Sequence, residues 1–319
     1  MSLLSEGIKR YLGEIQQRIT KAGYRQKDKQ LQAFARWLGP DCDVSTITRK
    51  VTGRYVADMV QPAALATKTK KDWIANLTAF GSWLEQYGLI EANPWRNLTR
   101  AIKESTRGGK PQPRPYTPDE LAALVQKLPV GSPLLPLACI SAYSGLRIEE
   151  IAAMKADHVT AGAFRVMEAK NENSVRYVPV HPIIEPMVAR LIETSVDGHL
   201  ITGLIPGGAD GKRSHYASKA FGDFLRANGF KDTTLTFHSL RRSFTQRCET
   251  AGIPESTAKL LTGHARQSLT YGLYSPGPEY SSLTAAMQKV SYGPAADTLV
   301  VSLAARSAIT KKSRRRRKR

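Results

Sequence analysis

The chain has 319 residues, with 47 Lys or Arg against 27 Asp or Glu, and its formal net charge is +20. This excess favours a polyanionic partner, with nucleic acid ahead of an anionic membrane surface. No run of 18 apolar residues occurs, which argues against a membrane-spanning helix. None of the three cysteines forms a CxxC pair, which argues against a zinc site. The first residues do not resemble a signal peptide, and together with the cysteine pattern this favours a cytoplasmic protein.

Positive charge is spread along the whole chain. Residues 1–104 have a net charge of +7 and residues 295–319 one of +8, which leaves +5 for the part between them. The basic character is therefore not confined to the terminal run KKSRRRRKR, which itself suits a nonspecific grip on DNA or an import signal.

The first hundred residues predict four helices. Three of these are indicated by apolar residues at helical spacing. The stripes are Ile8, Tyr11, Leu12, Ile15 and Ile19; Leu31, Phe34, Ala35 and Leu38; and Trp73, Leu77, Phe80, Leu84 and Tyr87. The fourth helix is expected over residues 48–60, ending before Pro62. We therefore expect a four-helix domain over residues 1–103.

A break in composition separates this domain from the next. Residues 104–115 combine glycines, prolines and basic residues without apolar periodicity, which predicts an extended linker. The following Thr117-Pro118-Asp119-Glu120 has the pattern of a capping box with proline at the first helical position. We therefore place the start of a second domain at residue 116, and its end near residue 293.

The second domain predicts mainly helices with one small sheet. Alternating residues near 164–166 and 175–180 indicate two strands, joined by a turn over 170–173. Helices are expected over 119–128 and 133–143, from 145, and near 182–195, 215–228, 238–251 and 254–262. The predicted fold class is α+β, mainly α with a small β-sheet, and residues 294–319 form a C-terminal segment with a basic tail.

The segment TFHSLRRSFTQRC contains a candidate anion site. Leu240, Phe244 and Cys248 form its buried stripe, whereas His238 and Arg241 lie three apart on a different face, in the first helical turn. Unpaired backbone N–H groups there favour a phosphate. Taken alone, this pattern is more often an exposed basic helix start.

Three further candidates are equally ambiguous when taken singly. Arg147 follows a glycine at a helix start, and Glu150 could orient it, although a structural ion pair explains both residues as well. Lys170 lies in a predicted hairpin turn, where a lysine is ordinarily a solvated surface residue. His264 follows Gly263 after a helix, as a helix-capping histidine would.

Taken in chain order, these motifs resemble those of the tyrosine recombinase (phage integrase) family. The matching motifs are Arg147 in GLRIEE, Lys170 ahead of RYVPV, His238 and Arg241 in HSLRR, and Gly263-His264 followed by tyrosines. The resemblance implies a core-binding domain over residues 1–103 and a catalytic domain over residues 116–293.

The resemblance also implies a mechanism and a set of catalytic residues. A tyrosine attacks a DNA phosphodiester to give a 3′-phosphotyrosyl intermediate, with Arg147, Lys170, His238, Arg241 and His264 around the phosphate and no metal or other cofactor. The family usually places its tyrosine nine residues after the second histidine. That position is Leu273 here, with Tyr271 two residues before it and Tyr274 one after. Since Gly272 can absorb one extra residue, we assign Tyr274, and Tyr271 would then pack or contact DNA.

Partners and biological role follow from the same resemblance. Double-stranded DNA is the expected substrate, bound by a homotetramer, with DNA-bending accessory proteins as further partners, in the cytoplasm of a bacterial host at its nucleoid. Lys68, Lys70, Lys71 and Arg242 are expected to contact DNA.

The expected role is integration and excision of a phage or mobile element. Dimer resolution, a non-catalytic DNA-binding regulator and a type IB topoisomerase are the alternatives. The segment after residue 294 is expected to dock into a neighbouring subunit.

Overall fold

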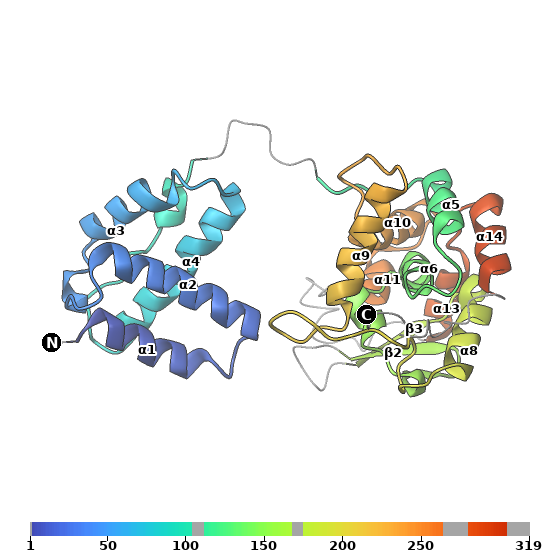
Figure 1. The fold of residues 1–319 in the computed structure, drawn as a ribbon, viewed down its shortest axis with the longest axis horizontal. Coiled ribbons are helices and arrows are strands. Elements are labelled where there is room, and N and C mark those ends of the chain that lie inside the picture. Colours follow the sequence, from blue (N-terminus) through green and yellow to red (C-terminus); the bar gives the residue numbers. More distant parts are fainter. Residues whose placement is uncertain (1, 104–111, 168–174, 264–279, 305–319) are drawn as a thin grey trace, which may run out of the picture. The chain divides into compact units, whose positions relative to one another are not determined.

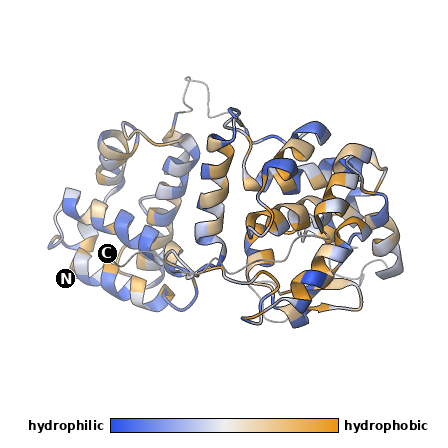
Figure 2. Cartoon of the chain, turned by 45° about the vertical axis from the view of Figure 1, so that its right-hand side comes forward, coloured by the Kyte–Doolittle hydropathy of each residue, from blue (hydrophilic) through white to orange (hydrophobic). Residues whose placement is uncertain are grey.

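A computed structural model describes residues 2–103, 112–167, 175–263 and 280–304 (Figure 1). The chain divides into two compact units, Met1–Pro111 and Gln112–Arg319. In each unit the hydrophilic residues lie mainly on the outward faces of the helices (Figure 2). No helix in the described ranges is long and apolar enough to cross a membrane.

The regular elements in the described residues of the first unit are helices. Its α-helices are α1 (Leu4–Ile15), α2 (Lys21–Leu38), α3 (Arg49–Tyr55) and α4 (Thr67–Gln86). Short 3₁₀ helices η1 (Val44–Thr46) and η3 (Leu98–Ala101) accompany them. The helix expected over residues 48–60 changes type part-way, because a π-helix, η2 (Val56–Val60), continues α3.

The core of this unit contains several packed aromatic rings, and its stripe on α4 differs from the predicted one at the C-terminal end. Leu77, Phe80 and Leu84 are buried as their spacing predicts. Tyr87 is 44% exposed, and its hydroxyl donates a hydrogen bond to Glu14 Oε2 at 3.1 Å. Trp83 is buried instead and packs against Tyr11. The polar groups of Tyr and Trp side chains allow these large rings to lie at the edge of a core. The buried face of a helix is therefore hard to predict from hydrophobicity alone where these residues occur.

Two glycines in these helices form a matched pair for mutation. A Cβ at Gly81, inside α4, would lie 2.2 Å from Asn93 Oδ1, whereas one at Gly13 of α1 would meet nothing within 4 Å. We expect Gly81→Ala to lower the free energy of unfolding by about 1–3 kcal/mol through overpacking. We expect Gly13→Ala to raise it by about 0.5–1 kcal/mol, because alanine favours the helix. Urea unfolding of the full chain measures both; equal effects would contradict the packing at Gly81.

The second unit surrounds a buried helix. Its helices are α5 (Pro118–Lys127), α6 (Leu134–Ser144), α7 (Ile148–Ala152), α8 (Glu185–Glu193), α9 (Ser214–Ala227), α10 (Phe237–Thr250), α11 (Glu255–Thr262), α13 (Tyr280–Gln288) and α14 (Pro294–Ala304). Every residue of α6 is buried. Short 3₁₀ turns, η4 (Ala156–His158) and η5 (Pro182–Ile184), lie beside the sheet and before α8.

Local signals at the start of this unit are confirmed. Thr117 Oγ1 accepts a hydrogen bond from the Glu120 amide at 3.2 Å, and Glu120 Oε2 accepts one from the Thr117 amide at 2.9 Å. This is the predicted capping box, and it begins α5 at Pro118. The helix expected from residue 145 is only the five-residue α7.

A three-stranded antiparallel sheet has the order β1–β2–β3, with β1 (Val159–Thr160), β2 (Ala163–Met167) and β3 (Val175–Pro179). Met167 pairs with Val175 at the last described rung of the β2–β3 hairpin. Lys170 belongs to residues 168–174, which lie outside the described residues.

The C-terminal helix α14 packs on its own unit. In α14, Ala296 and Val300 are buried, and the helix packs against α5, α8 and η5 of its own chain. Asp297 accepts hydrogen bonds from Tyr143 Oη at 2.5 Å and Ser291 Oγ at 2.6 Å, which fixes the start of the helix. Residues 294–304 therefore cover part of their own unit through this apolar face. Docking of the segment after residue 294 into a neighbouring subunit stays a prediction.

Candidate active site

The helix α10 begins with its own capping interactions. The Thr236 amide donates to Ser239 Oγ at 3.1 Å, as in a capping box. Leu240, Phe244 and Cys248 are buried as predicted, and α10 packs on α6 through this face. This packing determines which way the polar residues of the first turn point.

Arg241 is buried between two helix ends. Only 3% of it is exposed, and its Nη1 donates to the Gly145 carbonyl oxygen at 2.6 Å, after α6. Its Nη2 donates to the Thr262 carbonyl oxygen at the end of α11. Burial, and then the charge of Arg147, lower the pKa of Arg241 to about 10. The carbonyl ends of two helices thus hold a guanidinium that is still charged at neutral pH.

A carboxylate beneath the surface holds two more arginines. Glu150 Oε1 accepts from Arg147 Nη1 at 2.7 Å, and Glu150 Oε2 accepts from Arg176 Nη2 of β3 at 2.8 Å. Burial would raise the pKa of Glu150, but Arg176 and the hydrogen bonds from Arg147 outweigh it and lower that pKa. Glu150 therefore orients Arg147, as its spacing suggested. Arg176 is a residue that the sequence analysis missed.

The glycine before His264 is required by its surroundings. Gly263 ends α11 with φ +66°, a left-handed conformation, and a Cβ there would lie 2.5 Å from Arg176 Nη1. Its carbonyl oxygen accepts a longer bond from Arg147 Nη2 at 3.4 Å. The chain therefore leaves α11 directly beside the arginines. His264, Tyr271 and Tyr274 themselves lie outside the described residues.

These side chains surround a hollow of about 380 Å³. Its lining includes Arg147, His238 and Arg241, together with Lys212 and residues of α7, α9 and α10. Partial burial, and then the charges of Arg241, Arg242 and Arg147, lower the pKa of His238, so its imidazole is mostly neutral at pH 7. A concave surface with three cationic side chains, those of Arg147, Lys212 and Arg241, fits an anion such as a phosphate. The first unit has a hollow of its own, of about 560 Å³, lined by residues between Ser45 and Pro94.

Other predicted residues are not part of this group. Arg242 is exposed on α10 and does not line the hollow. The three lysines of α4 belong to the first unit, where Lys68 pairs with Asp72 at 3.0 Å and Lys70 donates to the Gln61 carbonyl oxygen. His238 and Arg241, predicted to share a face, do line the same hollow, although His238 is exposed and Arg241 is buried.

Lys212 and Glu149 were also missed from the sequence. Glu149 accepts hydrogen bonds from the amides of Arg213, at 3.2 Å, and Ser214, at 2.8 Å, and so caps α9 from α7. This contact brings Lys212 to the hollow. No local pattern distinguishes either residue from an ordinary surface charge. In the ranges that the structure describes, no group of three or more His, Cys, Asp or Glu could hold a metal ion.

Comparison with known proteins agrees with this geometry. The sequence profile of the phage integrase family matches residues 116–276, just over half of the chain. The chain belongs to the phage integrase family. The match spans α5 to the segment after α11, and so contains every residue of the hollow.

Solved integrases share the fold. A lambda integrase dimer bound to a COC′ core site superposes with a TM-score of 0.66 at 19% identity, covering 84% of this chain and 97% of that one. A lambda integrase tetramer bound to a Holliday junction gives a TM-score of 0.65 at 19% identity, covering 84% and 79%. The Tn1549 transposon integrase in complex with circular intermediate DNA gives 0.64 at 17%, covering 90% and 99%. A search of curated proteins gave no match. The predicted α+β fold class is confirmed.

Replacing Glu150 tests the arrangement of the two arginines. Glu150 and Arg176 have side chains only 14% and 13% exposed, so Glu150→Gln leaves a buried guanidinium without its counter-charge. We expect a loss of about 3 kcal/mol in the free energy of unfolding at pH 7. Since the pKa of Glu150 is lowered from 4.5, this contribution is full above pH 4.5 and is lost as the pH falls through the lowered value.

Urea unfolding as a function of pH measures this loss. The control is Asp223→Asn, which breaks an ion pair with Arg226 whose side chains are 54% and 73% exposed. Such a surface pair contributes less than about 1 kcal/mol. A similar small loss for Glu150→Gln would show that the carboxylate does not hold the arginines.

Proposed function

We propose that this protein is a site-specific DNA recombinase that integrates and excises a phage or mobile element. The observation that carries the proposal is the convergence of Arg147, His238 and Arg241 on one hollow in a member of the phage integrase family. Its structural neighbours were solved on a core site, on a Holliday junction and on a circular intermediate. These neighbours support double-stranded DNA as substrate and a homotetramer as the working assembly.

In the proposed first step, Tyr274 attacks a DNA phosphorus atom. The Tyr274 Oη–P bond forms and the P–O5′ bond breaks, which gives a 3′-phosphotyrosyl intermediate. The tyrosine proton passes to His238 or His264, and Lys170 gives a proton to the departing 5′-oxygen. The 5′-hydroxyl of a partner strand then attacks the phosphotyrosyl bond, releases Tyr274 and reseals the backbone. Because bond energy is conserved through both steps, no nucleotide cofactor is needed.

The arginines act on the charge that develops at phosphorus. Arg147 and Arg241 donate to the non-bridging oxygens, and their orientation is fixed in advance by Glu150, Gly145 and Thr262. Donors held in place before reaction stabilise the transition state without reorganising. Removal of one such donor raises a barrier by about 3 kcal/mol.

The proposal also assigns the domains of the chain and the residues that contact DNA. Residues 1–103 form a core-binding domain, 104–115 the linker and 116–293 the catalytic domain, with 294–319 as the C-terminal segment. Lys68, Lys70, Lys71 and Arg242 contact DNA phosphates, consistent with the net charge of +20. The cytoplasm of a bacterial host is the proposed location, with DNA-bending proteins as accessory partners.

Trapping the covalent intermediate identifies the nucleophile. On a nicked suicide substrate carrying the cognate site, the wild type should accumulate a covalent protein–DNA adduct. Tyr274→Phe should abolish the adduct, because phenylalanine has no hydroxyl, whereas the matched variant Tyr271→Phe should retain it. The reverse pattern would assign Tyr271. No adduct from the wild type would favour a non-catalytic DNA-binding protein.

The pH dependence of cleavage tests the role of His238. Its pKa is lowered from 6.5, so the neutral imidazole that accepts a proton dominates at pH 7 and is lost as the pH falls through that lowered value. We expect the second-order rate constant of cleavage by the wild type to fall as the pH falls through the lowered pKa of His238, which lies below 6.5. In His238→Gln the rate should be low throughout and this limb should be absent. An unchanged limb in the variant would assign the titration to another group.

A further inference from the structure

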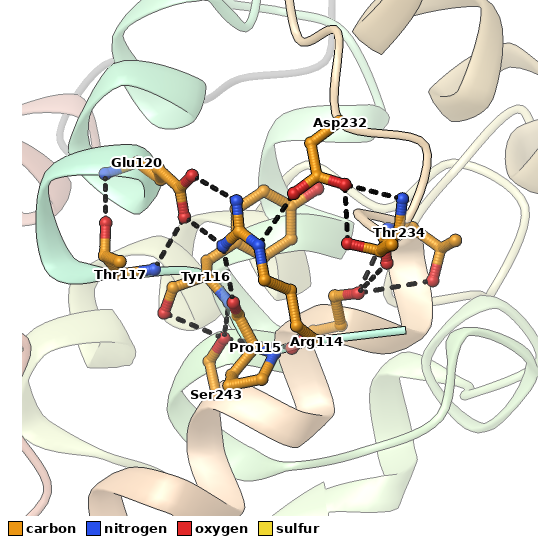
Figure 3. Close-up of polar contacts among 10 residues, drawn as sticks. Arg114, Pro115, Tyr116, Thr117, Glu120, Asp232, Thr234 and Ser243 are labelled. Carbon is orange, nitrogen blue, oxygen red and sulfur yellow. Dashed lines mark hydrogen bonds and ion pairs between the residues drawn. The ribbon is translucent and has the colours of Figure 1, made fainter. Parts of the chain in front are cut away.

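The end of the linker is fixed by one guanidinium. Arg114 donates from Nη1 and Nη2 to the two carboxylate oxygens of Glu120, at 2.7 and 2.6 Å, and from Nε to Asp232 Oδ2 at 2.7 Å (Figure 3). Glu120 belongs to the capping box of α5, and Asp232 precedes α10. A planar fork shared between two carboxylates fixes orientation more strictly than a single charge pair.

From Asp232, hydrogen bonds lead into the first turn of α10. Asp232 Oδ1 accepts from the Thr234 amide at 2.8 Å and from its hydroxyl at 2.6 Å (Figure 3). The Thr234 carbonyl oxygen accepts from Ser239 Oγ at 3.2 Å. Ser239 does not line the hollow itself, but it lies in the same helical turn as His238 and Arg241, which do, so the chain of bonds ends next to them.

A second contact reaches the same helix from Tyr116, the first residue after the linker. The Tyr116 amide donates to Ser243 Oγ at 2.8 Å, and that hydroxyl donates to the Ser239 carbonyl oxygen at 2.9 Å (Figure 3). Tyr116 is 1% exposed, and burial fixes its backbone. Residues 114 and 116 thus hold α10 at two points.

These contacts affect geometry as well as stability. The Arg114 side chain is 38% exposed, so solvent screens its ion pairs, although a bidentate pair joined to a second carboxylate is stronger than an isolated surface pair. The same contacts fix Asp232 in position relative to Glu120.

We propose that Arg114 is a positioning residue that sets the orientation of His238 and Arg241 through Asp232, Thr234 and Ser239. This inference rests on the proposed recombinase function. Arg114 itself touches no reacting atom. Its loss lets the start of α10 shift, and small displacements of reacting groups lower a rate steeply.

The test compares full-length Arg114→Ala with wild type on the nicked suicide substrate. At saturating DNA we expect the single-turnover rate of adduct formation to fall about tenfold, with DNA affinity changed less than about twofold. Arg114→Lys keeps the charge but not the fork, and should retain an intermediate rate. Arg114→Ala/Asp232→Asn should be no slower than Arg114→Ala, since both act through one route.

Arg226→Ala is the matched control. It removes the same charge from an exposed ion pair on α9, and its rate should equal that of the wild type. All rates are measured well below the thermal midpoint of each variant; if Arg114→Ala is unfolded there, Arg114→Lys decides. A wild-type rate at saturation, or a loss confined to DNA affinity, overturns the positioning role. Absence of an adduct from the wild type overturns the recombinase function instead.

Discussion

The buried guanidinium of Arg241 is the interaction on which the rest of the site depends. A cation with 3% exposure needs partners, and it finds them in carbonyl oxygens at the ends of α6 and α11. Both helices end in a glycine with positive φ, Gly145 and Gly263. At Gly145 a Cβ would also lie 2.5 Å from Phe244 of α10. One side chain therefore ties three helices together at the floor of the hollow.

Repulsion among the cations is reduced by a single carboxylate. Arg147, Arg176 and Arg241 lie close enough for their charges to affect one another, and Glu150 is the acid that contacts two of them. The remaining positive potential faces the hollow, where Arg147 is 43% exposed and His238 is mostly neutral at pH 7. Such an arrangement orients donors before an anion arrives, which is the condition for stabilising a transition state electrostatically.

Much of the fold follows from local patterns, and the exceptions have physical causes. Leu77 and Phe80 on α4, and Leu240 and Phe244 on α10, are buried because helical periodicity places them on one face. Residues Val56–Val60 continue α3 as a π-helix, which the spacing of the apolar residues does not predict. The burial of Ala296 and Val300 on α14 depends on the packing of α5 and α8, which lie far from them in the sequence.

The sequence by itself determined the family motifs, the capping box at Thr117 and Glu120, and the helix that carries His238 and Arg241, because these depend on residues within a few positions of one another. Only the tertiary structure decided that Arg176 joins Glu150 from 26 residues away, that Arg147 reaches Gly263 across 116 residues, and that Arg241 is buried while His238 is exposed. The periodicity of apolar residues predicts which face of a helix is buried. Which charged side chains come into contact depends on how elements far apart in the sequence pack together.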